Sequence, residues 1–246
     1  MRNQIASEWR KLRTTRSAYG LLGGAVALAG VAAWAMVATM HFGPSTELTT
    51  LPGFAEMMVI VPIFVVVLGI RSYTDEARYG SIVPTLLSDP NRRRVVAAKA
   101  VVLGIAAIGF ALAASATVAI VSSVLLLAEG TAISVSLASV GPLVVMAIVI
   151  CVLWSAVGLG IGLTVSHQVA AIVGAILWLL VGESLAEMLA SGVAKFLPGH
   201  AATSLLGIAA ADASLLAPLA GAVVLTGWAI GSVAIGSRAF ARRDVA

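Results

Sequence analysis

Few polar side chains in this sequence have the chemistry of a catalytic or metal-binding site. The histidines are too widely spaced along the chain to suggest a shared metal centre; they are His41, His167 and His200. The Gly-x-Ser-x-Gly and His-Glu-x-x-His patterns of hydrolases do not occur. Ser166, His200, Glu183 and Glu187 are the only candidates for an intramembrane hydrolase, which the sequence makes a disfavoured alternative.

The sequence also lacks a recognisable nucleotide-binding loop. Such a loop needs Gly-Lys followed by Ser or Thr, because its backbone N–H groups and lysine hold phosphate oxygens. The three lysines instead follow Arg10, Ala98 and Ala194. The single cysteine, Cys151, offers neither a disulfide nor a zinc site. We therefore expect a chain that is not an enzyme and binds no metal or other cofactor itself.

The composition is that of an integral membrane protein. Of the 246 residues, 60% are hydrophobic and 11% are charged, against about 25% charged in ordinary soluble domains. A bilayer crossing needs about 20 apolar helical residues, and we predict six such helices within one domain, 1–246. The predicted spans are 18–40, 51–70, 100–128, 140–165, 169–189 and 215–237. Helices are favoured over strands because the alternating pattern of a membrane barrel is missing.

The basic residues predict the orientation of these spans. Fourteen of the fifteen Lys and Arg residues lie before the first span, in 71–99, or after the last span. With six spans all three segments fall on one side, which the positive-inside bias makes cytoplasmic. Both termini are therefore predicted to be cytoplasmic, with the turn at 166–168, while the connections around Glu47 and Glu129 lie outside. The basic balance is a topology signal and does not indicate nucleic-acid binding.

Two segments are predicted to be helical without crossing the membrane. Residues 5–17 place Ile5, Trp9 and Leu12 on one face and most charged residues, including Glu8 and Arg13, elsewhere, which is typical of an interfacial helix. Residues 191–214 are apolar but interrupted by Gly and Pro, so we expect short broken helices on the outer side, between the fifth and sixth spans.

The polar connection 71–99 is predicted to contain a helix, a break, a short exposed helix and a restart. Gly80 offers the break, 81–87 the short helix, and Ser88 or Asp89 the cap of the next helix, with Pro90 its first residue. Arg92, Arg93 and Arg94 are interpreted mainly as headgroup anchors. The apolar residues of the short helix instead favour a docking surface; they are Ile82, Val83, Leu86 and Leu87.

The chain as a whole resembles the permease subunits of type-2 ATP-binding-cassette exporters. The resemblance rests on six spans, the N-terminal "SEWRKLRTTRS", the connection "DEARYGSIVPTLLSDPNRRRVVAAKA" and the outer "FLPGHAATSLLG". Its most specific positions are Glu76, Arg78, Tyr79, Gly80, Thr85, Leu86, Leu87, Pro90, Arg92 and Lys99.

This resemblance implies a partner and a mechanism. Two permeases, either a homodimer or a pair with a related permease, would place their short coupling helices in grooves of two separate ATPase subunits, which bind ATP and Mg. The protein would export an unidentified substrate across the inner or plasma membrane, in contact with its lipids, and we expect a bacterial cell. Positions matching the family's coupling region also include Ile82 and Val83. The interfacial helix, with Glu8, Trp9 and Arg13, would contact the ATPase, and Pro198, Gly199 and His200 would line an outer gate.

Other features leave alternatives open. An ion-gradient-driven secondary transporter would need an ionisable or unwound site near the middle of a span, and a plain membrane anchor would need none. Glu183 and Glu187 lie four residues apart near an outer span end, where water exposure or a gating role is expected. Glycine pairs at the same spacing are expected to pack helices within one subunit; they are Gly20 and Gly24, Gly158 and Gly162, and Gly227 and Gly231.

Overall fold

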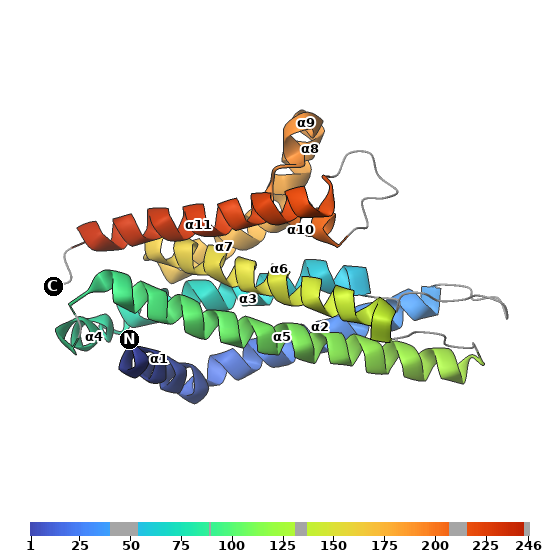
Figure 1. Ribbon diagram of the computed structural model, residues 1–246, viewed down its shortest axis with the longest axis horizontal. Coiled ribbons are helices and arrows are strands. Elements are labelled where there is room, and N and C mark those ends of the chain that lie inside the picture. Colours follow the sequence, from blue (N-terminus) through green and yellow to red (C-terminus); the bar gives the residue numbers. More distant parts are fainter. Residues whose placement is uncertain (40–53, 89, 131–136, 207–215, 244–246) are drawn as a thin grey trace.

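The described part of the chain is helical throughout its regular elements. The computed structural model describes residues 1–39, 54–88, 90–130, 137–206 and 216–243, with 55–59, 88, 137–139 and 191 described by backbone alone. The helices are α1 (Arg2–Thr14), α2 (Arg16–Thr39), α3 (Phe54–Arg78), α4 (Ile82–Ser88), α5 (Arg92–Ala128), α6 (Leu137–Thr164), α7 (Gln168–Leu177), the π-helix η1 (Trp178–Gly182), α8 (Glu183–Leu189), α9 (Ser191–Ala194), α10 (Pro198–Leu205) and α11 (Pro218–Arg242) (Figure 1).

Five helical segments are long and apolar enough to cross a membrane. Within the described residues these long apolar segments are Arg16–Thr39, Arg92–Ala128, Val140–Thr164, Gln168–Leu189 and Pro218–Arg242. The predicted span 51–70 overlaps α3, but a sixth crossing stays a prediction, as does the orientation of the termini. The expected outer connection around Glu47 lies outside the described residues.

Close backbone contacts hold the bundle around α6. A Cβ atom on Gly162 would lie 2.6 Å from the Ile70 carbonyl oxygen of α3, and Gly158 is in similarly close contact with Val66. On the opposite side, a Cβ on Gly236 of α11 would lie 2.6 Å from the Gly160 oxygen. The predicted packing role of Gly158 and Gly162 is confirmed, because only glycine lets α3 and α6 approach this closely.

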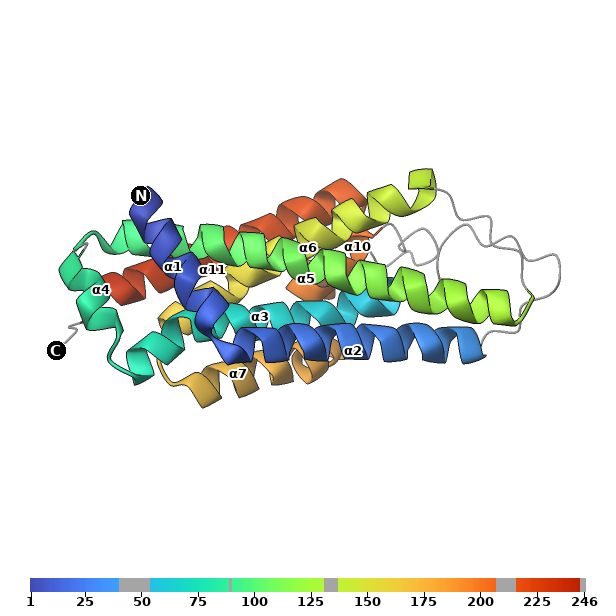
Figure 2. The same ribbon diagram turned by 90° about the horizontal axis from the view of Figure 1, so that it is seen from below.

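The N-terminus, the end of α11 and several helix connections lie at one end of the bundle. Figure 1 shows α4 and the end of α11 there, and Figure 2 shows α1 lying across α5 beside α4. We call this the basic end, since it carries Arg10, Lys11, Arg92, Arg93 and Arg243. The predicted N-terminal helix is present, beginning at Arg2 and ending at Thr14, earlier than expected, while its position at the membrane surface stays a prediction.

The corner between α3 and α5 differs in detail from the prediction. Gly80 has φ +68°, a left-handed conformation that suits glycine, and it separates α3 from α4. The predicted cap at Ser88 or Asp89 is wrong. Ser88 is the last residue of α4, and the Asn91 side chain accepts the Arg94 N–H at 3.3 Å, so Asn91 caps α5. Pro90 therefore precedes the helix instead of starting it.

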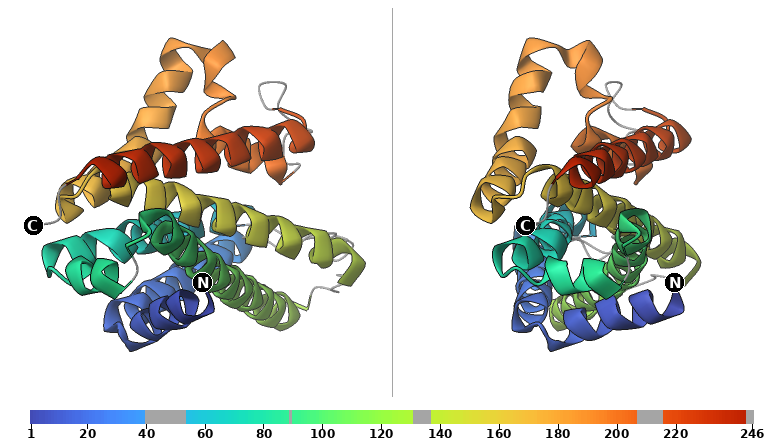
Figure 3. Two further views of the ribbon diagram at one scale, coloured as in Figure 1. Left: turned by 60° about the vertical axis from the view of Figure 1, so that its left-hand side comes forward. Right: turned by 90° about the vertical axis from the view of Figure 1, so that its left-hand side faces the viewer.

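The segment after α6 leaves the bundle. Figure 3 shows α7 diverging from α11, with α8 and α9 projecting beyond the other helices before α10 returns to α11. The predicted broken helices are present as α9 and α10, while 207–215 lie outside the described residues. The predicted tight turn is also present, since α6 ends at Thr164 and α7 begins at Gln168, while its side of the membrane stays a prediction.

We predict that Gly162→Val destabilises the fold strongly, because the side chain would collide with the α3 backbone. The loss should reach about 3 kcal/mol or more, the upper range for overpacked cores. Gly23→Val is the matched control, since a Cβ atom there meets nothing within 4 Å. Thermal unfolding in detergent should show a lower Tm for Gly162→Val alone; equal Tm values would contradict the close α3–α6 contact.

Candidate functional site

The candidate site is a buried cluster of four charged residues at the basic end. We call it the charge cluster: Glu8 and Lys11 from α1, Glu76 from α3 and Lys99 from α5. The spacing of three residues brings Glu8 and Lys11 to the same face of α1. The cluster joins three helices that are far apart in sequence, and its formal charges cancel.

Lys99 occupies the most buried position of the cluster. Its side chain is 2% exposed, and Nζ lies 2.7 Å from Glu8 Oε2 and 2.8 Å from Glu76 Oε1. The third ammonium proton is donated to the Ser72 carbonyl oxygen at 2.9 Å. All three donors of the ammonium group therefore have partners, as a buried charge requires.

Lys11 completes the cluster and connects it to the short helix. Its Nζ lies 2.7 Å from Glu8 Oε1 and 2.7 Å from Glu76 Oε1, and it donates to Thr85 Oγ1 at 3.2 Å. Thr85 belongs to α4 and donates its own hydroxyl proton to the Ser81 carbonyl oxygen. The position of α4 is thus coupled to the same two carboxylates that neutralise Lys99.

The local environment keeps the α1 members of the cluster charged. Burial alone would raise the pKa of Glu8, but the charge of Lys99 and hydrogen bonds from Lys11 and Lys99 outweigh it and lower the pKa. Burial alone would lower the pKa of Lys11, but hydrogen bonds to Glu76 and Glu8 outweigh it and raise the pKa. Both groups are therefore ionised at neutral pH.

A cavity lies beside the cluster. It has a volume of about 370 Å³ and is lined by all four cluster residues, with Arg71, Asp75 and Tyr79 on its wall. Glu76 Oε2 is buried and has no hydrogen-bond partner among the described residues. The cluster therefore retains an acceptor for a further donor.

The predicted coupling residues are divided between the interior and the surface. Ile82 is buried and packs in the core of the chain, whereas Val83 and Leu86 are half-buried. Tyr79 and Leu87 are 75% and 82% exposed. Arg78, Gly80, Pro84 and Pro90 are also exposed. An apolar surface remains around Tyr79 and Leu87, while Ile82 needs no external partner.

The interfacial-helix residues also differ from one another. Glu8 was expected on the polar face of that helix but is buried in the charge cluster. Trp9 is half-buried and Arg13 is exposed. The amphipathic pattern gave no signal for the inward position of Glu8, because its carboxylate is buried only through two lysines, one of which is 91 residues away.

A second set of contacts joins α5, α6 and the end of α11. It is made by Arg92, Phe240 and Arg243. Arg92 donates to the carbonyl oxygens of Phe240 and Arg243, the latter at 2.7 Å, and its guanidinium group lies 5.2 Å from the Phe240 ring centroid. Arg243 donates in turn to the last carbonyl groups of α6, at Leu163 and Thr164. Arginines thus satisfy the free carbonyl groups at two helix ends. Sequence reasoning missed these contacts.

A further hydrogen-bonded set joins α3 to α7. Asp75 pairs with Arg71 at 3.0 Å and accepts a hydrogen bond from Gln168 Nε2 at 2.6 Å. Arg78 donates to Gln168 Oε1 at 3.4 Å. Gln168 was identified only as a turn residue from the sequence, yet it fixes the start of α7 against the end of α3.

The predicted outer-gate residues come together away from the basic end. Glu183 accepts the Gly199 N–H at 2.8 Å and lies 3.3 Å from His200 Nδ1, while Glu187 lies 3.5 Å from His200 Nε2. The residue after Pro198 must be small, because a Cβ atom on Gly199 would collide with the Glu183 carboxylate. Glu183 is 5% exposed, so the expectation of water exposure is wrong for it, whereas the Glu187 side chain is 53% exposed.

The sequence comparisons were made against known families and curated proteins. The model of a family described as "ABC-2 family transporter protein" matches residues 4–182, which include the charge cluster, the short helix and most of the predicted spans. Among curated proteins, none matches the sequence significantly.

We predict that Lys99→Met destabilises the protein by about 3–5 kcal/mol, because it leaves buried carboxylates without their partner. Glu8→Gln should also be destabilising, and the double variant should lose less than the sum of the two single losses, since the residues are in direct contact. Equilibrium unfolding in detergent measures the cycle. Strict additivity would contradict the described Glu8–Lys99 pair.

We predict that Arg92→Lys lowers stability by about 1–2 kcal/mol, because lysine cannot reproduce both carbonyl contacts and the stacking on Phe240. Arg93→Lys and Arg94→Lys are matched controls, since both neighbours are exposed. Thermal unfolding should separate Arg92 from the other two. Identical Tm values for all three variants would support the headgroup-anchor interpretation instead.

Proposed function

Since the chain belongs to the ABC-2 family of transporter proteins, we propose that it is the permease subunit of an ATP-driven exporter and moves its substrate outward when paired with a separate ATPase. The observation that carries the proposal is the attachment of α4. A seven-residue helix at the basic end is linked through Lys11 and Thr85 to the charge cluster. A push on α4 therefore acts on α1, α3 and α5 together.

The surface around α4 suits a protein partner. The side chains of Tyr79 and Leu87 are exposed at the basic end. They lie beyond the long apolar segments of α3 and α5. Because these side chains lie beside polar residues and not within a long apolar helix, their exposure supports a contact with another protein. We propose that the ATPase covers Tyr79, Pro84 and Leu87, and that Arg13 of α1 contacts the same subunit.

The complex is proposed to contain two permeases and two ATPase subunits. ATP and Mg would bind to the ATPase chains, and the permeases would pair either as identical copies or with a related chain. We place the basic end in the cytoplasm of a bacterial cell, because basic residues are retained there. Energy from nucleotide binding would then enter through α4 and reach the outer gate at Glu183 and His200.

One feature favours a different function. Glu183 is buried in an apolar helical segment beside His200, directly after the π-helix Trp178–Gly182. An ionisable residue in such a position is also found in ion-coupled secondary transporters. The direct test is a proteoliposome assay: ATP-independent proton flux through the permease alone would support secondary transport and overturn the ATPase-driven proposal.

We predict that Leu87→Asn weakens ATPase association about tenfold, since it removes an exposed apolar contact near the proposed interface centre. Leu127→Asn is the matched control, because Leu127 is 67% exposed at the opposite end of α5. The measurements are co-purification of the ATPase and its hydrolysis rate with permease nanodiscs. Unchanged association for Leu87→Asn, or an equal loss for Leu127→Asn, would place the interface elsewhere.

A further inference from the structure

Gly227 and Gly231 of α11 border open space and do not contact a neighbouring helix in the described part of the chain. A Cβ atom on Gly227 or Gly231 would meet nothing within 4 Å, although Gly221 and Gly236 of the same helix are in close contact with α10 and α6. The expected intrachain packing role is therefore wrong for this pair. The missing side chains leave open space along one face of α11.

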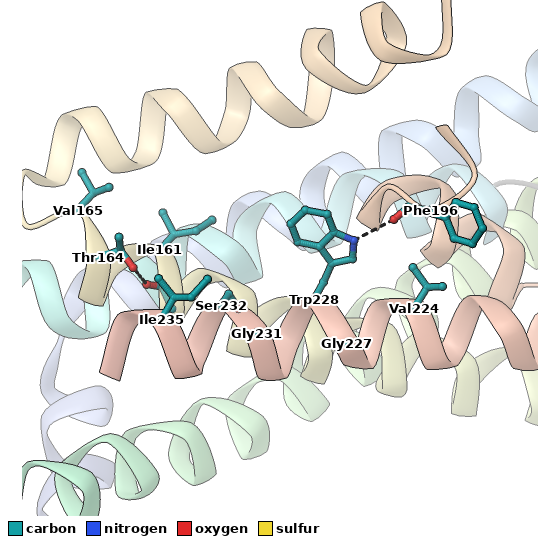
Figure 4. Close-up of a pocket in the computed structure, with 11 residues that line it drawn as sticks. Ile161, Thr164, Val165, Phe196, Val224, Gly227, Trp228, Gly231, Ser232 and Ile235 are labelled. Carbon is teal, nitrogen blue, oxygen red and sulfur yellow. Dashed lines mark hydrogen bonds between the residues drawn. The ribbon is translucent and has the colours of Figure 1, made fainter. Parts of the chain in front are cut away.

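This space is an apolar cleft between α6 and α11. It has a volume of about 680 Å³. Figure 4 shows Trp228 standing at one side, its indole N–H donating to the Phe196 carbonyl oxygen at 2.9 Å, with Ile161 and Val165 opposite. Its wall on α11 extends from Val224 to Ile235, which is about 16 Å at 1.5 Å per residue.

Two further cavities lie between the cleft and the predicted outer-gate residues, and each adjoins the next. The cleft shares Ile161, Val165, Trp228 and Ser232 with a second cavity of about 280 Å³, which contains Trp154 and Leu179 in its wall. Trp154 and Leu179 also line a third cavity, of about 190 Å³, that reaches Glu183 and His200. The three cavities therefore follow one another from the apolar cleft to the outer gate.

Trp154 stands where the second and third cavities meet. The residue is 3% exposed, yet its indole nitrogen has no acceptor among the described residues. A buried N–H group without a partner is costly. Trp154 therefore leaves an unpaired hydrogen-bond donor at this position within the described residues.

The charge along this path is confined to one end. Glu183 is the only Asp, Glu, Lys or Arg among the described lining residues of the three cavities. Its carboxylate receives Gly199 N–H and contacts His200, which leaves lone pairs for a further donor. Trp178 and Trp228 supply aromatic faces on the way, and such faces attract cations.

We propose that these cavities bind an amphiphilic ammonium compound, with its alkyl chain along Gly227 and Gly231 and its cationic head toward Glu183. Charge complementarity selects this occupant over a neutral or anionic one, because an apolar path ends at a carboxylate. The further step, that this compound class is what the protein exports, rests on the proposed function. Binding itself does not depend on an ATPase.

The test uses the full-length protein in phosphatidylcholine nanodiscs. Three probes share one brominated alkyl chain and differ in the head group: 12-bromododecylamine, 12-bromododecanol and 12-bromododecanoate. Bromine quenches tryptophan fluorescence on contact, and Trp154 and Trp228 line the path. The amine should reach half-maximal quenching at a concentration about tenfold below that of the other two probes. Gly231→Leu should raise that concentration about tenfold, because the new side chain fills the cleft.

Two further variants make the experiment specific. Gly20→Leu is the matched control, since Gly20 also faces open space but lies on α2. The fluorescence of this variant should be quenched at the same probe concentrations as that of the unmodified protein. Glu183→Gln keeps an acceptor for Gly199 N–H, and it should reduce the preference for the amine while leaving quenching by the alcohol unchanged.

The contrary outcomes are distinct. Equal quenching by the three probes would show ordinary partitioning into lipid and overturn the proposal, as would unchanged quenching in Gly231→Leu. Conversion of a dimer to a monomer by Gly231→Leu, seen by light scattering without amine-selective quenching, would assign the cleft to a second copy. Amine binding without ATPase association would contradict the proposed function and leave the binding proposal intact.

Discussion

Burial of the Lys99 ammonium group is the constraint on which the basic end depends. A cation that is 2% exposed needs opposite charge and a full set of acceptors, and one carboxylate supplies only part of this. Glu76 comes from the neighbouring helix, but Glu8 requires α1 to lie across α5. Two carboxylates then need a second cation, Lys11, whose third contact is Thr85 of α4. The placement of α1 and of α4 therefore follows from one buried charge.

The contacts around this cluster reach α11, which forms one wall of the apolar cleft, and α7, which lines the neighbouring cavity. Arg92, at the start of α5, holds the end of α11, and Asp75, one residue before Glu76, holds the start of α7 through Gln168. Beyond these attachments α7 and α11 diverge (Figure 3). A displacement of α4 and the ends of α3 and α5 would thus be applied to α7 and α11 at the basic end.

The sequence predicted features that depend on composition and short-range chemistry. Long apolar segments locate helices because lipid tolerates few alternatives, and the short helix after Gly80 was visible in the pattern of the connection. Glu76 and Lys99 were singled out by the family resemblance. Glu8 and Arg92 were assigned to surfaces, since their partners lie 91 and 148 residues away and no local pattern reports such contacts. The cap at Asn91 was missed because Ser88, Asp89 and Asn91 all have side chains suited to that role.

The glycine pairs show most clearly why local spacing does not determine function. Gly158 and Gly162 have the same four-residue spacing as Gly227 and Gly231, and both pairs occur in long apolar helices. The first pair receives the α3 backbone, while the second faces a cleft that ends, two cavities later, at a buried carboxylate. A missing side chain lowers the cost of close approach for whatever lies opposite. Identifying what lies opposite requires the position of the neighbouring helix, and at Gly227 and Gly231 no described atom outside the helix's own nearby backbone lies within 4 Å of an added Cβ.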